Sequence, residues 1–470
     1  MEEDERYDFG LIGLGTMGRN FVYNICDHGF SVAGFDKDNS KLEELEKEKG
    51  SKKAFGAKDI PEFLSKLVIP RVILLLVPSG PVVDTVIAEL KPLLSLNDLL
   101  IDCGNSHFTD TDRRIVQLAK ENIRFMGVGI SGGEYGARYG PSIMPGGEFE
   151  SYKRVAAMFE AVSAKVGTVS CVEYMGPGSA GHYVKMVHNG IEYALMQMIS
   201  ESYHLLKQVA GFGNEELHAV FSKWNEGMIQ SYLIEITATI FEQKDDLTNV
   251  YLVDKILDSA HQKGTGMWMS QNAMDLKVPV PSIDAAVSAR DLSELKAGRV
   301  AASRILPGVP NQNEVDKDEL ISWLEQALCF SMISAYAQGF SLMIAGSAEY
   351  QYHLKPENIA KIWRGGCIIR SAILETIETA FKQEPDLTNL MLNGALTKKL
   401  SETQQGLRRV VRLAVESGIP VPVFGASLSY FDGYRTERLP SNLLQAQRDY
   451  FGAHTYQRTD RPGNFHTNWK

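Results

Sequence analysis

The sequence has 470 residues, of which 44% are hydrophobic and 23% are charged, with a formal net charge of −10. This length and balance suit two or three globular domains. The acidic excess argues against a nucleic-acid-binding protein, although a local basic pocket could still hold an anionic substrate. Five scattered cysteines and an acidic N-terminus predict a cytoplasmic protein without disulfides, zinc or a targeting peptide. We also expect no membrane span, which needs roughly 20 apolar residues.

Short apolar runs alternate with helix-like segments over the first third of the chain. The expected strands are residues 9–12, 32–35, 72–77, 99–102 and 123–128, and the clearest helical segments between them are residues 81–93 and 109–120. Such alternation predicts a parallel sheet with helices on both faces. We therefore expect residues 1–177 to form an α/β domain of the Rossmann type.

The pattern changes after Pro177. Residues 178–210 contain no proline and carry apolar side chains at helical spacing, which predicts a single helix of many turns. Further helical patterns, including residues 316–346 and 371–381, continue to about Gly433. Residues 178–434 are therefore expected to form a large all-α domain.

The last segment, residues 435–470, is polar and rich in Arg, Asn, Gly and Pro. A structureless tail of this length should be either disordered or docked on another surface. Its aromatic side chains favour docking. These aromatic residues are Tyr450, Phe451, Tyr456, Phe465 and Trp469.

A glycine-rich turn follows the first expected strand. It has the pattern G-x-G-x-x-G and comprises Gly13, Gly15, Thr16, Met17 and Gly18. Glycines at this spacing let the N–H groups of the following helix approach a pyrophosphate. Taken alone, the pattern could be a chance tight turn. The second expected strand, however, ends at Asp36, where an acid that binds ribose belongs, so we favour a dinucleotide site.

The residues at the end of that strand bear on the choice of cofactor. A carboxylate at Asp36 can accept hydrogen bonds from both ribose hydroxyls, which suits NAD. It would repel the 2′-phosphate of NADP, and Asp38 adds to the repulsion. Lys37 either compensates in part or is simply a solvated charge at the start of a helix.

Polar residues gather on one face of the long expected helix. Lys185, His188, Asn189 and Glu192 are spaced i, i+3, i+4 and i+7, so they project from one side within about two turns. An isolated helix with this pattern would more often present a solvated stripe. Gly190 argues against that interpretation, because a glycine inside a helix costs about 1 kcal/mol relative to alanine and suggests a close approach by another group.

Four segments together carry a resemblance to a known family. They are the loop Ser131-Gly132-Gly133, the helical residues 185–193 (KMVHNGIEY), the turn 263–266 (KGTG) and residues 447–454 (QRDYFGAH) in the tail. On these segments the sequence resembles the 6-phosphogluconate dehydrogenases, the decarboxylating enzymes of the pentose phosphate pathway. The resemblance extends over nearly the whole chain. It implies that residues 178–434 serve substrate binding and dimerisation, and that residues 435–470 dock on the partner subunit.

The resemblance implies a role for each matching residue. Lys185 corresponds to the general base that takes a proton from the C3 hydroxyl, and Glu192 to the general acid that protonates C1 of the enediol. The residues implied to hold the sugar acid are Asn105, Ser131, Gly132, Gly133, His188 and Asn189. Those implied to hold its phosphate are Tyr193, Lys263, Thr265 and Arg290, with Arg448 and His454 contributed by the partner subunit of a homodimer.

The chemistry fits these residue types. A lysine can act as a base if a half-buried or cation-rich site lowers its pKa, and a carboxyl that donates a proton to carbon needs a raised pKa. Loss of carbon dioxide from a β-keto acid requires only that its carbonyl be polarised, so we expect no metal.

The sequence departs from the family at the cofactor. Gly15 stands where the family usually has alanine, and Asp36-Lys37-Asp38 stands where it reads Asn-Arg-Ser or Asn-Arg-Thr. The family default is NADP, but the local charges favour NAD or the use of both. The expected cofactor-binding residues are Gly13, Gly15, Thr16, Met17, Gly18, Asp36, Lys37, Asp38, Val77 and Asn105.

Two other functions compete with this assignment. A β-hydroxyacid dehydrogenase for a smaller acid would share the glycine turn, the Ser-Gly-Gly loop and the helix lysine, but it would lack the arginine–histidine tail and the long α-domain. A non-catalytic dinucleotide sensor would not need Lys185, Asn189 and Glu192 together, since it transfers no proton.

Overall fold

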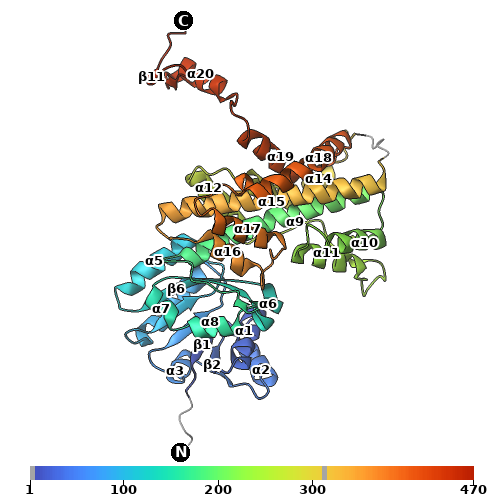
Figure 1. The fold of residues 1–470 in the computed structure, drawn as a ribbon. Helices are drawn as coiled ribbons and strands as arrows, with labels where there is room; N and C mark the ends of the chain where they lie inside the picture. The colour runs from blue at the N-terminus through green and yellow to red at the C-terminus, as the bar shows by residue number, and fades with distance from the viewer. Residues whose placement is uncertain (1–5, 310–314, 470) are drawn as a thin grey trace, which may run out of the picture.

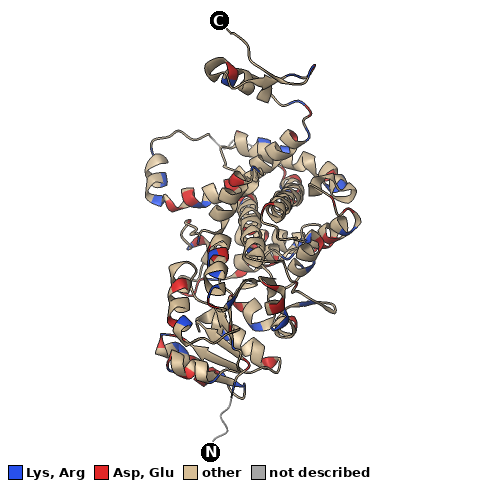
Figure 2. Cartoon of the chain, turned by 90° about the vertical axis from the view of Figure 1, so that its left-hand side faces the viewer, with Lys and Arg blue, Asp and Glu red and all other residues tan. Residues whose placement is uncertain are grey.

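The computed structural model describes residues 6–309 and 315–469. The predicted ranges 1–177, 178–434 and 435–470 therefore include residues 1–5, 310–314 and 470, which lie outside the described part. A sheet-containing part, a helical part and a small C-terminal part follow one another along the chain (Figure 1). Acidic and basic residues alternate along the ribbon of all three parts in the view of Figure 2.

The N-terminal part is built on a seven-stranded sheet with the order β3-β2-β1-β4-β5-β6-β7. The strands are β1 (Phe9–Ile12), β2 (Val32–Phe35), β3 (Ala54–Gly56), β4 (Val72–Leu75), β5 (Leu99–Asp102), β6 (Arg124–Ser131) and β7 (Ser142–Gly146). Each pairing up to β6 is parallel, whereas β7 pairs antiparallel with β6. The predicted α/β Rossmann-type fold followed by a helical part is confirmed. The sequence did not predict β3, the antiparallel edge strand β7, or the hairpin of β8 (Lys165–Val166) and β9 (Val169–Ser170).

Helices cover both faces of this sheet (Figure 1). Neighbouring residues of a strand point to opposite faces, and Leu11 and Ile12 of β1 accordingly join different hydrophobic clusters. The helices are α1 (Thr16–Asp27), α2 (Asn39–Glu48), α3 (Ile60–Ser65), α4 (Pro81–Leu90), α5 (Phe108–Ala119), α6 (Gly133–Tyr139), α7 (Phe149–Lys153) and α8 (Ala156–Val162).

Two long helices form the centre of the helical part, α9 (Ala180–Gln208) and α15 (Lys317–Glu349). They pack closely where a Cβ atom added to Gly339 would lie 2.5 Å from the Ile191 side chain. The surrounding helices are α10 (Asn214–Trp224), α11 (Tyr232–Glu242), α12 (Thr265–Asp275), α13 (Pro281–Glu294), α14 (Lys296–Ala302), α16 (Pro356–Trp363), α17 (Ile373–Gln383), α18 (Gly394–Glu416) and α19 (Pro422–Tyr434).

Helix α15 corrects one expectation. By length and composition alone it is apolar enough to cross a membrane, contrary to the prediction that no segment approaches this property. However, 89% of its most apolar window is buried inside the protein, as in the core helix of a folded domain. The apolar residues of α15 therefore have a packing role in this fold.

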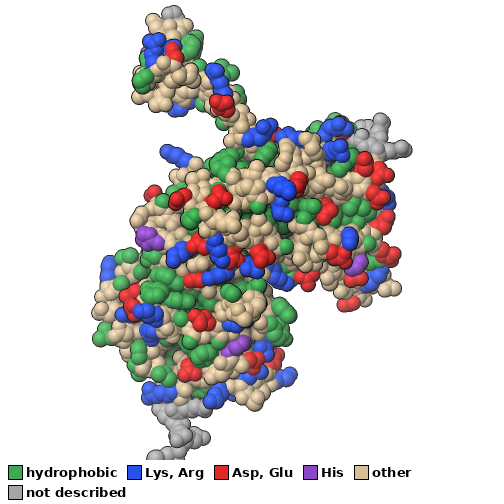
Figure 3. Space-filling model, viewed as in Figure 1, with side chains coloured by type: hydrophobic (Ala, Val, Ile, Leu, Met, Phe, Trp, Pro, Cys, Tyr) green, Lys and Arg blue, Asp and Glu red, His purple; other side chains and the backbone are tan. Residues whose placement is uncertain are grey.

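The C-terminal segment is not structureless, and that expectation was wrong. It forms α20 (Ser441–Gly452) followed by a small antiparallel pair, β10 (Tyr456–Gln457) and β11 (Asn464–Phe465). Figures 1 and 3 show this unit standing away from the helical part on a narrow connection. It exposes large apolar side chains, including those of Leu443, Leu444, Tyr450 and Phe451.

Candidate active site

The glycine turn lies between β1 and α1 and has the geometry of a dinucleotide-binding turn. Gly13 has φ +100°, and a Cβ atom there would lie 2.5 Å from the Leu76 carbonyl oxygen. A Cβ atom on Gly18 would overlap the Gly13 carbonyl, whereas one on Gly15 would meet open space. No side chain caps the start of α1, which begins at Thr16. The N–H groups there are thus available to a pyrophosphate, and Gly15 leaves room for its approach.

Asp36 follows β2 at the edge of this turn. Its carboxylate accepts hydrogen bonds from the Leu14 amide (2.7 Å) and the Asp38 amide (2.9 Å). A carboxylate has about four acceptor positions, so Asp36 can still accept from ribose hydroxyls. Asp38 caps α2 by accepting from the Ser40 amide, while the Lys37 amine pairs with Glu89 at 2.6 Å.

The loop after β4 borders the same turn. A Cβ atom on Gly13 would lie 3.1 Å from a methyl carbon of Val77, which is half-buried. The structure therefore brings Val77 beside the glycine turn and Asp36, as expected for cofactor candidates that share one edge of the sheet.

The polar face of α9 forms a connected cluster. Lys185 is 6% exposed and its amine lies 3.5 Å from Nδ1 of the fully buried His188. The Glu192 carboxylate, 20% exposed, lies 3.8 Å from the same nitrogen. On the other side of the ring, Nε2 of His188 lies 3.1 Å from Oγ of Ser131. The amine and the carboxyl thus approach one histidine, so they face a common site and are not part of a solvated stripe.

Burial moves the pKa values of this cluster in opposite directions. Burial lowers the pKa of the Lys185 amine, an effect that the nearby charge of Glu192 partly opposes. It raises the pKa of the Glu192 carboxyl, against the influence of Lys185 and Arg290. Burial also lowers the pKa of His188 far below its ordinary value, so this ring is neutral at pH 7. An amine that gives up its proton more easily and a carboxyl that retains its proton are what an acid–base pair requires.

Two loops of the sheet reach this face of α9. The amide of Asn189 donates to Oδ1 of Asn105 at 3.4 Å, and Asn105 is exposed in the loop that follows β5. Gly132 and Gly133, after β6, have φ values of +120° and +62°. A Cβ atom on Gly132 would lie 2.5 Å from the Gly366 carbonyl oxygen, so only glycine allows the loop to pass this closely. The six residues expected to hold the sugar acid therefore adjoin one another.

Helix α12 packs tightly against α9. A Cβ atom on Gly190 would overlap the sulfur atom of Met269, and one on Gly266 would lie 2.5 Å from the Tyr193 ring. The close approach that Gly190 suggested is therefore made by a helix of the same chain. The packing places Thr265, at the N-terminus of α12, near Tyr193.

Further phosphate candidates lie around this contact. The Arg290 guanidinium stacks over the Tyr193 ring at 3.5 Å from its centre, while Lys263 is exposed just before α12. Arginine, lysine and helix N–H groups together suit a phosphate. Arg448 and His454, by contrast, lie in the detached C-terminal unit, so a single chain does not bring them to this site (Figure 1).

One buried residue of this region was not predicted. Arg114 of α5 is 1% exposed, and its guanidinium donates to Asp84 (2.8 Å) and to the Gly80 carbonyl (2.9 Å) beside the loop after β4. It also donates to Asp102 and Ser106, both at 3.3 Å, on either side of the loop after β5. Arg114 therefore ties together the two loops that carry Val77 and Asn105. An arginine in a polar helix gives no sequence signal for such a role.

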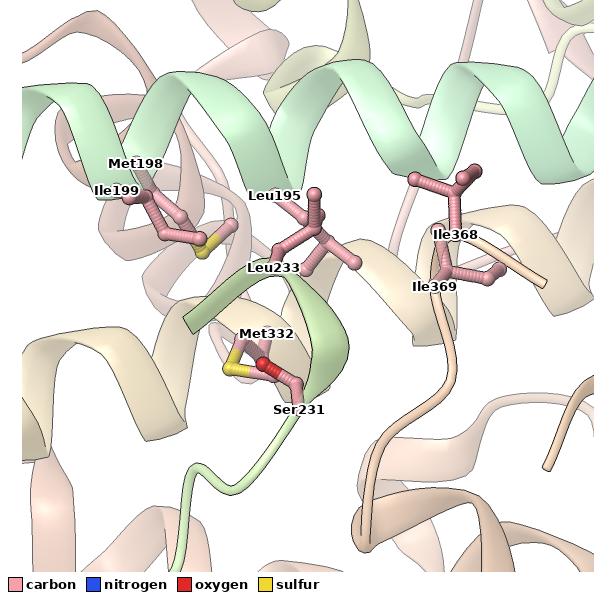
Figure 4. A pocket seen from close by; sticks show the side chains of 8 residues that line it. All are labelled: Leu195, Met198, Ile199, Ser231, Leu233, Met332, Ile368 and Ile369. Carbon is pink, nitrogen blue, oxygen red and sulfur yellow. The ribbon is translucent and has the colours of Figure 1, made fainter. Parts of the chain in front are cut away.

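One cavity beside the active-site helix is too small to hold a substrate. A cavity of about 10 Å³ lies beside the middle of α9 among apolar side chains such as Leu195 and Met332 (Figure 4). It is at the lower limit for one water molecule and far too small for a sugar acid. Within residues 6–309 and 315–469, no group of three or more His, Cys, Asp or Glu side chains could hold a metal ion.

Comparison with known proteins relates both parts of the chain to one family. Residues 8–176 match the family described as the NAD binding domain of 6-phosphogluconate dehydrogenase, and residues 181–469 match its C-terminal domain. A Bacillus subtilis protein named 6-phosphogluconate dehydrogenase, NADP(+)-dependent, decarboxylating is 52% identical over 466 residues, which cover 99% of both chains. A Saccharomyces cerevisiae 6-phosphogluconate dehydrogenase, decarboxylating 1 is 50% identical over 96% of this chain and 92% of its own.

A solved structure shows the same fold over nearly the whole chain. The Plasmodium falciparum 6-phosphogluconate dehydrogenase, studied in its apo form and in complexes with NADP+ and 6-phosphogluconate, superposes with a TM-score of 0.94 at 43% identity. The match covers 98% of this chain and all of that one. This chain belongs to the 6-phosphogluconate dehydrogenase family.

Proposed function

We propose that this protein catalyses the oxidative decarboxylation of 6-phospho-D-gluconate to D-ribulose 5-phosphate and carbon dioxide with reduction of a nicotinamide dinucleotide. The observation that carries the proposal is the approach of the Lys185 amine and the Glu192 carboxyl to one buried histidine. The assignment also rests on near full-length similarity to enzymes of that name.

The proposed steps use Lys185 first as a base. Its amine takes the proton of the C3 hydroxyl, while a nicotinamide held at the glycine turn would serve as the hydride acceptor for C3. The protonated amine then polarises the new C3 carbonyl, so that the C1 carboxylate leaves as carbon dioxide and the electron pair remains on the sugar. The carbonyl oxygen takes the proton from Lys185, which leaves an enediol and a neutral amine.

Glu192 completes the reaction as an acid. Its carboxyl delivers a proton to the carbon that becomes C1 of ribulose 5-phosphate, while Lys185 takes the proton of the neighbouring hydroxyl. His188, Asn189, Ser131 and the Asn105 loop would orient the sugar acid. Transfer of one proton from the Lys185 amine to the Glu192 carboxylate then restores the starting state. The pair therefore holds a single proton when a reaction cycle begins.

The pH dependence of kcat/KM should report this shared proton. We expect a bell-shaped profile, because the pair holds two protons at low pH and none at high pH. The lowered pKa of Lys185 and the raised pKa of Glu192 move both limbs toward neutrality. In Glu192→Gln, residual activity should rise with pH to a plateau without the fall at high pH. A profile for Glu192→Gln that keeps this fall would argue against the role of Glu192.

We further propose that the active form is a homodimer in which the C-terminal unit of each chain completes the phosphate site of its partner. Arg448 and His454 lie in a unit that stands apart from the rest of its own chain. The unit exposes apolar side chains, as a docking element would. We also propose that the domain boundaries lie at residues 177 and 434, and that the protein is located in the cytoplasm. Within one chain, the residues proposed to bind the substrate phosphate are Tyr193, Lys263, Thr265 and Arg290.

For the cofactor, we propose that NAD is accepted at least as well as NADP, although the Bacillus subtilis relative is named as NADP-dependent. Asp36 and Asp38 bring two negative charges to the end of β2, and the Lys37 amine is engaged by Glu89. A 2′-phosphate would meet net repulsion there.

Replacing these three residues with those usual in the family should shift the cofactor preference from NAD toward NADP. The triple variant Asp36→Asn, Lys37→Arg, Asp38→Ser should raise the NADP/NAD ratio of kcat/KM by about tenfold or more, equivalent to ~1.4 kcal/mol. Serine can still cap α2. Asp59→Ser, which alters the analogous cap of α3, is the matched control and should leave the ratio unchanged. A wild-type enzyme with a strong preference for NADP would contradict the proposal.

The function itself is tested by mixing purified protein with 6-phosphogluconate and either nucleotide and following absorbance at 340 nm. We expect reduced nucleotide and carbon dioxide in equal amounts. Activity on a small β-hydroxy acid without activity on 6-phosphogluconate would favour the competing dehydrogenase, and binding of nucleotide without turnover would favour a sensor.

A further inference from the structure

The C-terminal unit is organised around one buried carboxylate. Asp449 of α20 has no exposed surface. Its Oδ1 accepts from the Thr455 amide (3.0 Å) and lies 2.9 Å from Nδ1 of His466. Its Oδ2 accepts from the Thr467 amide (3.1 Å) and the Trp469 indole (2.8 Å). A single side chain thus joins the helix, the turn after it and the end of the chain.

These contacts keep the carboxylate ionised. Burial raises the pKa of Asp449, but hydrogen bonds from His466, Trp469 and the Thr467 amide outweigh this effect and hold the pKa at about 2. The unit therefore contains a permanent negative charge at neutral pH, and its N–H partners converge on that charge.

The turn that Asp449 holds is strained. Ala453 and Thr455 have φ values of +49° and +60°, in the left-handed region that a β-branched residue such as threonine rarely adopts. His454 lies between them. A Cβ atom on Gly452 would lie 2.7 Å from the His454 ring, so the ring sits directly against the helix end. Backbone of this kind persists where surrounding contacts fix it, and it concentrates at functional sites.

A second side chain connects the same turn to Arg448. The Gln445 amide donates to the Thr455 carbonyl at 2.6 Å, and its oxygen accepts from the Arg448 guanidinium at 3.1 Å. Asp449 binds the Thr455 N–H while Gln445 binds the Thr455 carbonyl. The positions of Arg448 and His454 relative to each other are therefore set within the unit, before any partner is bound.

We propose that Asp449 is a positioning residue that presets Arg448 and His454 as a pair for the phosphate of the neighbouring subunit's substrate. This inference rests on the proposed role of the C-terminal unit in the homodimer. A preformed pair binds phosphate without the entropic cost of ordering the turn, so loss of Asp449 should weaken phosphate binding and leave the chemical step intact.

The test uses the full-length protein with Asp449→Asn, which removes the charge and keeps the shape. We expect the KM for 6-phosphogluconate to rise about tenfold or more, with kcat and the KM for nucleotide unchanged. The inhibition constant of inorganic phosphate, as a competitor of the substrate, should rise by a similar factor. Asp460→Asn, which changes an exposed carboxylate paired with Arg458 in the same unit, should behave as wild type.

The variant Arg448→Ala distinguishes the proposed role of the C-terminal unit from the positioning role of Asp449. If Arg448→Ala leaves both constants unchanged, the proposed function of the C-terminal unit is wrong. If Arg448→Ala raises both constants and Asp449→Asn raises neither, the positioning role alone is overturned. Should Asp449→Asn weaken the dimer, both constants are measured at protein concentrations at which sedimentation velocity shows the dimer restored, so that only the contacts of Asp449 differ from wild type. A rise in both constants supports the inference, and wild-type constants overturn it.

Discussion

Replacing Lys185 with methionine is expected to lower turnover of 6-phosphogluconate by at least about 100-fold, because burial lowers the pKa of the neighbouring His188 far below its ordinary value and makes that ring a weak base. Methionine has nearly the same length and suits a position that is 6% exposed. The substitution also removes a buried amine, so stability should be maintained or increased. Steady-state rates at 340 nm give the turnover, and calorimetric titration gives the dissociation constant of the nucleotide, which should not change.

A second lysine of the same helix provides the control for this variant. Lys207 pairs with Asp254 near the end of α9, away from the cluster. Lys207→Met should retain wild-type turnover. Residual activity of Lys185→Met above one hundredth of wild type would count against its role as the base.

Deletion of residues 436–470 is expected to weaken substrate binding and dimerisation together. Loss of Arg448 and His454 removes charge-assisted hydrogen bonds worth about 1.5–3 kcal/mol each, so the KM for 6-phosphogluconate should rise at least tenfold. The deleted unit also carries the exposed apolar side chains that we expect to dock on the partner. Sedimentation velocity should therefore show a monomer, with nucleotide affinity retained.

The sheet and the helical part do not depend on that unit for their own packing, so the thermal unfolding transition provides the check on folding. Arg448→Ala in the full-length chain separates the two effects, since it should raise the KM while the dimer persists. A fully active truncated monomer would refute the proposed role of the C-terminal unit.

The parts of the fold that follow from local sequence pattern were predictable. Strands β1, β2 and β5 are buried on both faces and appear as short apolar runs, so their bounds were predicted to the residue. Strand β7 contains Pro145 and Gly146 and has no such pattern, because it becomes a strand only by pairing with β6 at the sheet edge. The C-terminal unit was missed for a similar reason. Its structure depends on Asp449, whose partners lie up to 20 residues away.

The candidate site could likewise be predicted from the sequence only where it depends on local pattern. Helical spacing alone placed Lys185, His188 and Glu192 on one face of α9. Whether that face is buried depends on contacts that no local pattern encodes, such as that between Ser131 and His188, which are 57 residues apart. The interhelical contact made at Gly190 was visible in sequence only as an unexplained glycine.

The most direct test of this account is a crystal structure of the wild-type protein with 6-phosphogluconate bound. We predict the Lys185 amine within hydrogen-bonding distance of the C3 hydroxyl, the Glu192 carboxyl against the carbon that it protonates, and the phosphate between Arg290 and the partner subunit's Arg448. A sugar bound elsewhere, or these two side chains turned away from it, would contradict the account.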